Sequence, residues 1–370
     1  MPNSLESLVP FRISVADSEL ADLGDRLART RWAHELPGQD WTYGVGLDYL
    51  QKLVDYWQNG YQWQVWEDRL NRYPQYYTTI DGQLVHLLHV RSSRPDAIPL
   101  VLSHSWPGSV ADYIEVIDAL TEPAGDEPAF HLVIPSLPGF GFSGPTTEPG
   151  WGTTRIGRAW AELMHRLGYH RYGAGGNDIG SRVSMALALH APDEVIGVHV
   201  TQIWSEPRGD AGELDGLSEA DKAGLETRAW FKANYGGYAV LQSQQPQTLA
   251  HALADSPTGL LAWYGQIYQD EVSPDAILTD VTITWLTGTV ASNLRLFYEN
   301  KLAGLPTEPT RVPVGLAQFT NDFVSIRHFA ERDHHNIVSW NTYDAPGHYA
   351  ARQSPDLLVG DIRQFFAGLR

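Results

Sequence analysis

The sequence has 370 residues, of which 43% are hydrophobic and 11% aromatic, as in folded globular proteins. Lys and Arg number 26 against 44 Asp and Glu, a net charge of −18, which disfavours nucleic acid and anionic membrane surfaces as partners. The absence of cysteine excludes disulfides, thiolate nucleophiles and cysteine-ligated metal sites.

The N-terminal sequence has no pattern typical of a targeting signal. The first twenty residues lack the basic and apolar regions of a secretory signal peptide, and no apolar run approaches membrane-spanning length. We therefore expect a cytoplasmic protein without a membrane partner. The sequence is compatible with a homodimer but does not set the oligomeric state.

The N-terminal part of the chain, residues 1–95, is rich in Trp and Tyr and is expected to form short helices and loops. Residues 17–32 have helical spacing and begin with an Asp, and residues 46–70 fit two further helices. This segment is interpreted as a unit distinct from the rest of the chain.

Short β-prone segments then alternate with helix-length intervals. This pattern predicts an α/β fold with a mostly parallel sheet covered by helices on both faces. The strand signal disappears over residues 204–301, which read as helices, and returns before a C-terminal helix at 354–369. A core of residues 96–203 and 302–370, interrupted by a helical lid at 204–301, accounts for this order. The expected strands are 84–91, 98–104, 131–137, 171–176, 195–201, 311–319 and 336–344.

A glycine-rich turn, RYGAGGNDIGSRVSM at residues 171–185, lies between an expected strand and an expected helix. Hydrolases of the α/β type place a nucleophile at such a turn, usually the serine of G-x-S-x-G, a motif that this chain lacks. Asp178 stands in the serine position. A carboxylate with a reference pKa of about 3.9 is ionised at neutral pH and needs no base to attack. The alternative is that Asp178 is an ordinary helix N-cap.

Two further segments favour the catalytic interpretation. The segment LSHSWPGS comes after an expected strand, where the backbone N–H groups of Trp106 and Ile179 could bind a developing oxyanion. Near the C-terminus, His348 lies on a loop between the last strand and the last helix, the usual place of the catalytic base. Asp322 comes after the preceding strand and is the expected acid, with Asp333 and Asp344 as alternatives.

Together with these positions, the segments HSWPGS, PSLPGFGFS, GGNDIGS, WLTGTVASNLRLFYEN and GHYAA resemble the microsomal-type epoxide hydrolases over nearly the whole chain. The resemblance implies an α/β-hydrolase fold with an N-terminal wrapping segment and a helical lid. It also implies that no cofactor is needed and that the partners are a small epoxide and water. Asp178 would form an alkyl ester with the epoxide, and His348, oriented by Asp322, would activate the water that hydrolyses it.

Lid tyrosines bind the epoxide oxygen in this family, and here the sequence departs from the pattern. Tyr238 matches the first tyrosine, but Phe297 occupies the second position. Tyr298 is adjacent, yet neighbouring helix residues point about 100° apart. Either Tyr238 acts alone or a local shift brings Tyr298 into the site.

Smaller departures concern the acid and the oxyanion loop. The acid motif reads Phe-Thr-Asn-Asp where the family has F-P-x-E/D, and Ser105 stands where a glycine is commoner, which requires a negative φ at Ser105. The aromatic residues Phe297, Trp263 and Trp204 are expected to contact a bulky apolar or aryl epoxide.

Parts of the sequence also suggest a metal site, a different enzyme activity or a protein without enzyme activity. The pairs His334–His335 and His86/His89 suggest a metal site but lack carboxylates at ligand spacing, so no metal site is expected. The alternatives are a haloalkane dehalogenase, which also uses an Asp nucleophile, and a catalytically silent ligand-binding relative. Similarity to bacterial members favours a role in secondary-metabolite biosynthesis over detoxification.

Overall fold

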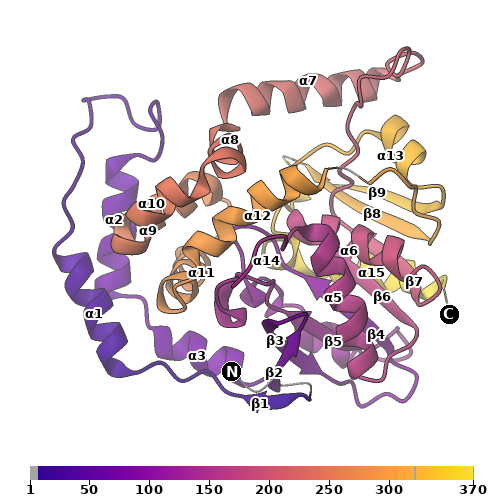
Figure 1. Ribbon diagram of the computed structural model, residues 1–370, viewed down its shortest axis with the longest axis horizontal. Coiled ribbons are helices and arrows are strands. Elements are labelled where there is room, and N and C mark those ends of the chain that lie inside the picture. The colour runs from indigo at the N-terminus through magenta and orange to yellow at the C-terminus, as the bar shows by residue number, and fades with distance from the viewer. Residues whose placement is uncertain (1–6, 305, 321, 370) are drawn as a thin grey trace.

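The computed structural model describes residues 7–304, 306–320 and 322–369 (Figure 1). Its central feature within these residues is a nine-stranded sheet in the order β1-β2-β3-β5-β4-β6-β7-β8-β9. The strands are β1 (Val9–Phe11), β2 (Gln75–Ile80), β3 (Gln83–Val90), β4 (Ile98–Ser103), β5 (Phe130–Pro135), β6 (Tyr172–Gly176), β7 (Val195–Val200), β8 (Val314–Thr320) and β9 (Ile337–Pro346).

Neighbouring strands from β5 to β9 in the sheet are parallel, whereas β1, β2 and β3 join the sheet through antiparallel pairs. The mostly parallel sheet is therefore confirmed. The interpretation of residues 1–95 as helices and loops was wrong for β1 and β2. The β2 sequence QYYTTI lacks the apolar run of the central strands, although its aromatic and β-branched residues and the two-residue Asp81-Gly82 turn into β3 are local signals of a hairpin.

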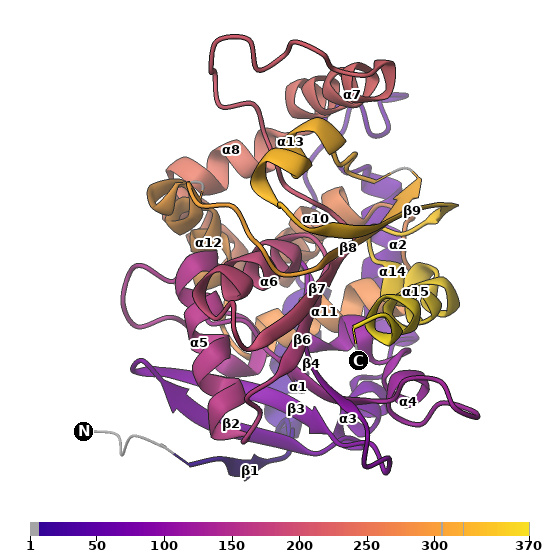
Figure 2. The same ribbon diagram turned by 90° about the vertical axis from the view of Figure 1, so that its right-hand side faces the viewer.

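Helices cover both faces of the sheet, as an α/β fold requires (Figure 2). One face carries α5 (Thr153–Arg166) and α6 (Ile179–His190), and the other carries α4 (Ile117–Thr121) and α15 (Pro355–Ala367). These layers place the carboxyl ends of the parallel strands, and the loops that extend from them, beneath a helical lid.

The helical lid extends from the loop after β7 to the start of β8 (Figure 1). Its first helix, α7, begins with a capping box in which Ser218 and Asp221 exchange hydrogen bonds. A proline lies in the first turn of α9, α10 and α11, where its fixed φ suits helix initiation. The lid helices are α7 (Glu219–Asn234), α8 (Gly237–Gln244), α9 (Pro246–Asp255), α10 (Pro257–Tyr268), α11 (Pro274–Leu286) and α12 (Val290–Ala303).

The N-terminal helices α1 (Asp17–Ala28), α2 (Leu47–Asn59) and α3 (Trp63–Asn71) pack against the lid: α1 and α2 contact α10, and α3 contacts α11. The remaining helices are α13 (Arg327–Asp333) and α14 (Ala350–Gln353). Among the described residues, no helix has the length and apolar character needed to cross a membrane.

Candidate active site

The turn between β6 and α6 holds Asp178 in a strained conformation. Asp178 has φ 50° and ψ −121°, a backbone conformation that residues other than glycine rarely adopt. Two glycines make this turn possible. A Cβ on Gly180 would lie 1.9 Å from the carbonyl oxygen of Ser103, and one on Gly176 would lie 2.5 Å from the carbonyl carbon of Gly180. The predicted sharp elbow is therefore present, with Asp178 at its apex.

The carboxylate of Asp178 faces backbone donors. The N–H of Trp106 donates to its Oδ1 at 3.1 Å, and the N–H of Ile179 also points at the carboxylate. Burial raises the pKa of Asp178, although the charge of His348 and these two N–H groups oppose the shift. The structure thus brings Trp106, Ile179 and Asp178 together in the arrangement expected of an oxyanion site.

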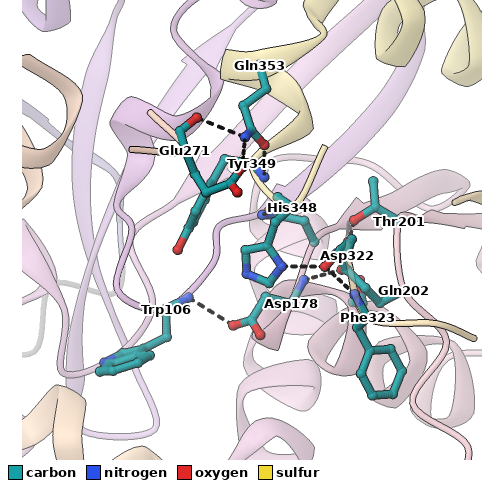
Figure 3. A network of polar contacts seen from close by, with 12 residues as sticks. Trp106, Asp178, Thr201, Gln202, Glu271, Asp322, Phe323, His348, Tyr349 and Gln353 are labelled. Atoms are coloured by element: carbon teal, nitrogen blue, oxygen red, sulfur yellow. Dashed lines mark hydrogen bonds and ion pairs between the residues drawn. The ribbon is translucent and has the colours of Figure 1, made fainter. Parts of the chain in front are cut away.

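His348 and Asp322 form the second part of the site (Figure 3). Nδ1 of His348 lies 2.5 Å from Oδ1 of Asp322, and the backbone carbonyl of His348 accepts a hydrogen bond from Asn177 at 3.0 Å. Burial lowers the pKa of His348, but the carboxylates of Asp322 and Asp178 outweigh that effect and raise it to about 9. Asp178, Asp322 and His348, which were predicted from separate parts of the sequence, therefore lie together at the end of the sheet.

Asp333 and Asp344, the alternative acids, lie elsewhere. Asp333 forms ion pairs with Arg208 and Arg332, and Asp344 is exposed on β9. Neither contacts His348, whose carboxylate partner among the described residues is Asp322. Asn321, the residue before Asp322 in the acid motif, lies outside the described residues.

The loop after β4 accommodates serine in place of glycine. Ser105 has a negative φ, as the sequence required. Its hydroxyl donates to Oδ2 of Asp112 at 2.7 Å, and its backbone N–H points at the same oxygen at 3.2 Å. The substitution therefore adds a hydrogen bond that anchors the loop carrying Trp106.

Gln202 is a site residue that sequence reasoning missed. Its Oε1 accepts the backbone N–H of Asp178 at 2.6 Å, and its Nε2 donates to Oδ2 of Asp322. The hydroxyl of Thr201 holds the same Oε1 at 2.8 Å. One amide thus connects the backbone of the elbow to the acid (Figure 3). Its position two residues after the end of the central strand β7 was the signal available in the sequence.

The lid contributes Tyr238 from α8 and Phe297 from α12. The ring of Tyr238 stacks on that of Trp106 with centroids 5.2 Å apart, and Phe297 meets Trp106 edge-on at 5.1 Å. Tyr298 is 38% exposed, and it is Phe297 that lines the cavity beside Asp178. The suggestion that a local shift brings Tyr298 into the site is not supported, because the helix directs it outwards as its 3.6-residue period dictates.

A cavity of about 490 Å³ lies between α6 and the lid helices α8 and α12, a size suited to a small organic ligand. Trp204 contributes to its wall, whereas Trp263 packs against the hydrophobic core, so its predicted substrate contact is not observed. Arg182, one helical turn after Asp178, also lines the cavity and lies over the ring of Trp204. This cation was not predicted.

The histidine pairs that suggested metal ligands have other partners. His86 contacts Ser136 and Gln75, and His334 contacts Thr310. Among the residues that the structure describes, no group of three or more His, Asp or Glu side chains could hold a metal ion.

Comparison with known proteins agrees with this geometry. The family model described as "Epoxide hydrolase N terminus" matches residues 8–113, and the model described as "alpha/beta hydrolase fold" matches residues 98–239. A putative epoxide hydrolase of Stigmatella aurantiaca (strain DW4/3-1) is 39% identical over 378 residues, which cover 98% of this chain and 86% of that protein. This chain belongs to the epoxide hydrolase family.

Other epoxide hydrolases are similar over most of their length. Epoxide hydrolase 1 of Sus scrofa is 31% identical, with 97% of this chain and 88% of that protein covered. The structure of Aspergillus niger epoxide hydrolase matches with a TM-score of 0.87 at 29% identity, covering 99% of this chain and 98% of that one. The structure of juvenile hormone epoxide hydrolase from Bombyx mori matches with a TM-score of 0.90 at 26% identity, covering 99% of this chain and 95% of that one. The α/β-hydrolase fold and the assignment as a hydrolase are thereby confirmed, and the dehalogenase alternative is not supported.

Proposed function

We propose that this epoxide hydrolase converts an apolar or aryl epoxide to a vicinal diol through a covalent ester of Asp178. The observation that carries the proposal is the strained elbow, which holds an ionisable carboxylate beside the N–H of Trp106 and next to the His348–Asp322 pair. A carboxylate suits this reaction because the target is a saturated carbon with no carbonyl group to activate.

In the first step, a carboxylate oxygen of Asp178 attacks an epoxide carbon while that carbon's bond to the ring oxygen breaks. The departing oxygen takes a proton from Tyr238, which faces the site from the lid. Burial, and then the charge of Asp178, raise the pKa of Tyr238. The hydroxyl is therefore protonated at neutral pH and able to donate.

In the second step, His348 takes a proton from water, whose oxygen attacks the ester carbon of Asp178. The N–H groups of Trp106 and Ile179 face the carboxylate and would bind the oxyanion of the tetrahedral intermediate. Collapse breaks the C–O bond of the ester, and the second proton of the water passes to the departing oxygen. The diol leaves with one oxygen from Asp178, and the carboxylate is left with one oxygen from water. Asp322 keeps the imidazole oriented throughout.

The wall of the cavity supports an apolar or aryl substrate, since Tyr238, Phe297 and Trp204 present aromatic surface beside Asp178. Two relatives from Ctenocephalides felis are named juvenile hormone epoxide hydrolases, which fits an organic epoxide as the substrate class here. A role in secondary metabolism, a cytoplasmic location and a homodimer stay predictions from the sequence.

A direct test compares diol formation from styrene oxide by the wild type and by Asp178→Asn, Asp322→Asn and Asp344→Asn. We expect diol from the wild type and from Asp344→Asn, whose carboxylate is exposed on β9. Asp178→Asn and Asp322→Asn should lose most or all turnover. Full turnover by Asp178→Asn would contradict the proposed ester.

A further inference from the structure

Tyr349 comes directly after His348 in the chain and is held rigidly beside it. Its ring meets the imidazole of His348 edge-on, with centroids 4.7 Å apart, and packs at 4.8 Å on Tyr268. Its backbone N–H donates to Oε1 of Gln353 at 2.8 Å, and Gln353 in turn bonds the lid residue Glu271. The orientation of Tyr349 is therefore fixed by contacts to its ring and its backbone.

The hydroxyl of Tyr349 is buried, yet it has no hydrogen-bond partner among the described residues. The neighbouring buried tyrosines differ, because Tyr268 donates to Asp280 at 2.7 Å and Tyr264 accepts from Asn293 at 2.7 Å. A buried hydroxyl without a partner opposes folding, and such groups in native proteins call for an explanation. Its position beside the site supplies one, since a ligand could provide the missing partner.

The direction of the Tyr349 hydroxyl is visible in Figure 3. It points to the region where the backbone nitrogen of Trp106, the imidazole of His348 and the carboxylate of Asp178 converge. Burial raises the pKa of Tyr349, and the charges of Asp178 and Asp112 and the hydroxyl of Tyr238 add to this shift. The hydroxyl is therefore protonated at neutral pH and able to donate.

We propose that Tyr349 is a catalytic residue that binds the epoxide oxygen together with Tyr238. The inference rests on the proposed function and adds a residue to it. Phe297, which lines the cavity from lid helix α12, has no hydroxyl, and Tyr298 is directed away from the site. Tyr349 would supply the second hydroxyl from the core of the protein instead of from the lid.

Protons and bonds balance in this step without any further reactant. Asp178 forms its bond to carbon, the C–O bond of the epoxide breaks, and the freed oxygen takes a proton from one tyrosine while accepting a hydrogen bond from the other. A Tyr349 tyrosinate regains its proton from the imidazolium of His348, whose ring it meets edge-on, and a Tyr238 tyrosinate regains its proton through the Tyr349 hydroxyl. His348 is then neutral and can accept a proton from water in the hydrolytic step.

The test uses Tyr349→Phe, which removes only the hydroxyl. Ester formation and ester hydrolysis are timed separately by single-turnover stopped-flow with styrene oxide, using tryptophan fluorescence and quenched-flow analysis. We expect ester formation to slow about 10- to 100-fold, the size of losing one of two donors to a developing oxyanion. The melting temperature should stay the same or rise, because the lost hydroxyl had no partner.

Two further variants complete the design. Tyr238→Phe should slow the same step, and Phe297→Tyr in the Tyr349→Phe background should recover part of the lost rate by returning a hydroxyl from the lid. The melting temperatures of Tyr349→Phe and of the double variant are compared as well. Equal melting temperatures would show that the recovered rate comes from the returned hydroxyl and not from a gain in stability.

An unchanged rate of ester formation in Tyr349→Phe would overturn the proposal. A variant that forms the ester normally but hydrolyses it slowly would also overturn it, because Tyr349 would then act on His348 and not on the epoxide. These outcomes differ from a failure of the proposed function, in which the wild type itself would form no ester.

Discussion

The carboxylate of Asp178 raises the pKa of His348, although no hydrogen bond joins the two side chains among the described residues. Burial lowers the pKa of His348, while Asp322 and then Asp178 raise it, to about 9 overall. Before the reaction the imidazole is therefore protonated at neutral pH. Once Asp178 becomes a neutral ester, one of the two carboxylate charges is gone, and His348 becomes a better base when a base is needed.

The pKa of His348 should depend on the charge of Asp178. In Asp178→Asn the pKa of His348 should fall below about 9, because one negative charge that stabilises the imidazolium has been removed. Titration by NMR, with the His348 resonance assigned by its loss in His348→Gln, measures the value. Asp344→Asn serves as the control and should leave it unchanged. An unaltered pKa in Asp178→Asn would show that the two groups are not coupled.

Both half-reactions should slow as the pH falls, each through its own group and over its own pH range. Ester formation needs ionised Asp178, whose pKa is raised by burial, so its rate should fall as the pH drops, starting above the ordinary Asp value of about 3.9. Ester hydrolysis needs neutral His348, so its rate should rise with pH, with an apparent pKa below about 9. Single-turnover rates across pH measure both. A hydrolysis rate that is flat across this range would exclude His348 as the base.

Gln202 is expected to matter because it contacts both halves of the site. Gln202→Leu leaves the backbone N–H of Asp178 and one oxygen of Asp322 without their partner. We expect kcat to fall about 10- to 100-fold, as when groups that orient reacting side chains are lost. Gln242→Leu on α8 is the matched control, since Gln242 is buried but its amide has no partner among the described residues. Equal activity in the two variants would refute the role given to Gln202.

A buried ion-pair cluster links the lid to the core. Arg352 lies 2.9 Å from Asp112 and 2.8 Å from Asp280 of lid helix α11, and all three side chains are almost fully buried. Removing one partner leaves an uncompensated buried charge, so Arg352→Met should lower the free energy of unfolding by roughly 3–5 kcal/mol. Urea denaturation measures it, with Lys222→Met as the control: Lys222 pairs with Glu219 on the surface, and its loss should cost less than about 1 kcal/mol.

The sequence predicted the elements whose signal is local. The apolar runs of the central strands and the elbow around Asp178 stand in the sequence itself, and helical period alone predicted that Tyr298 would diverge from Phe297. Strand β2 was missed because it lacks an apolar run, although its aromatic and β-branched residues and the Asp81-Gly82 turn into β3 are local signals. Gln202 was missed because its partner Asp322 is 120 residues away. The missing partner of Tyr349 is visible only when its surroundings are known.

The central claim is the covalent ester, and a single turnover of styrene oxide by excess enzyme in heavy-oxygen water tests it most directly. Mass spectrometry of the diol and of the peptide that contains Asp178 reads the result. The ester mechanism predicts an unlabelled diol and heavy oxygen in the Asp178 peptide, since water attacks the ester carbon. Heavy oxygen in the diol, with an unlabelled peptide, would mean that water attacks the epoxide directly and would contradict the account.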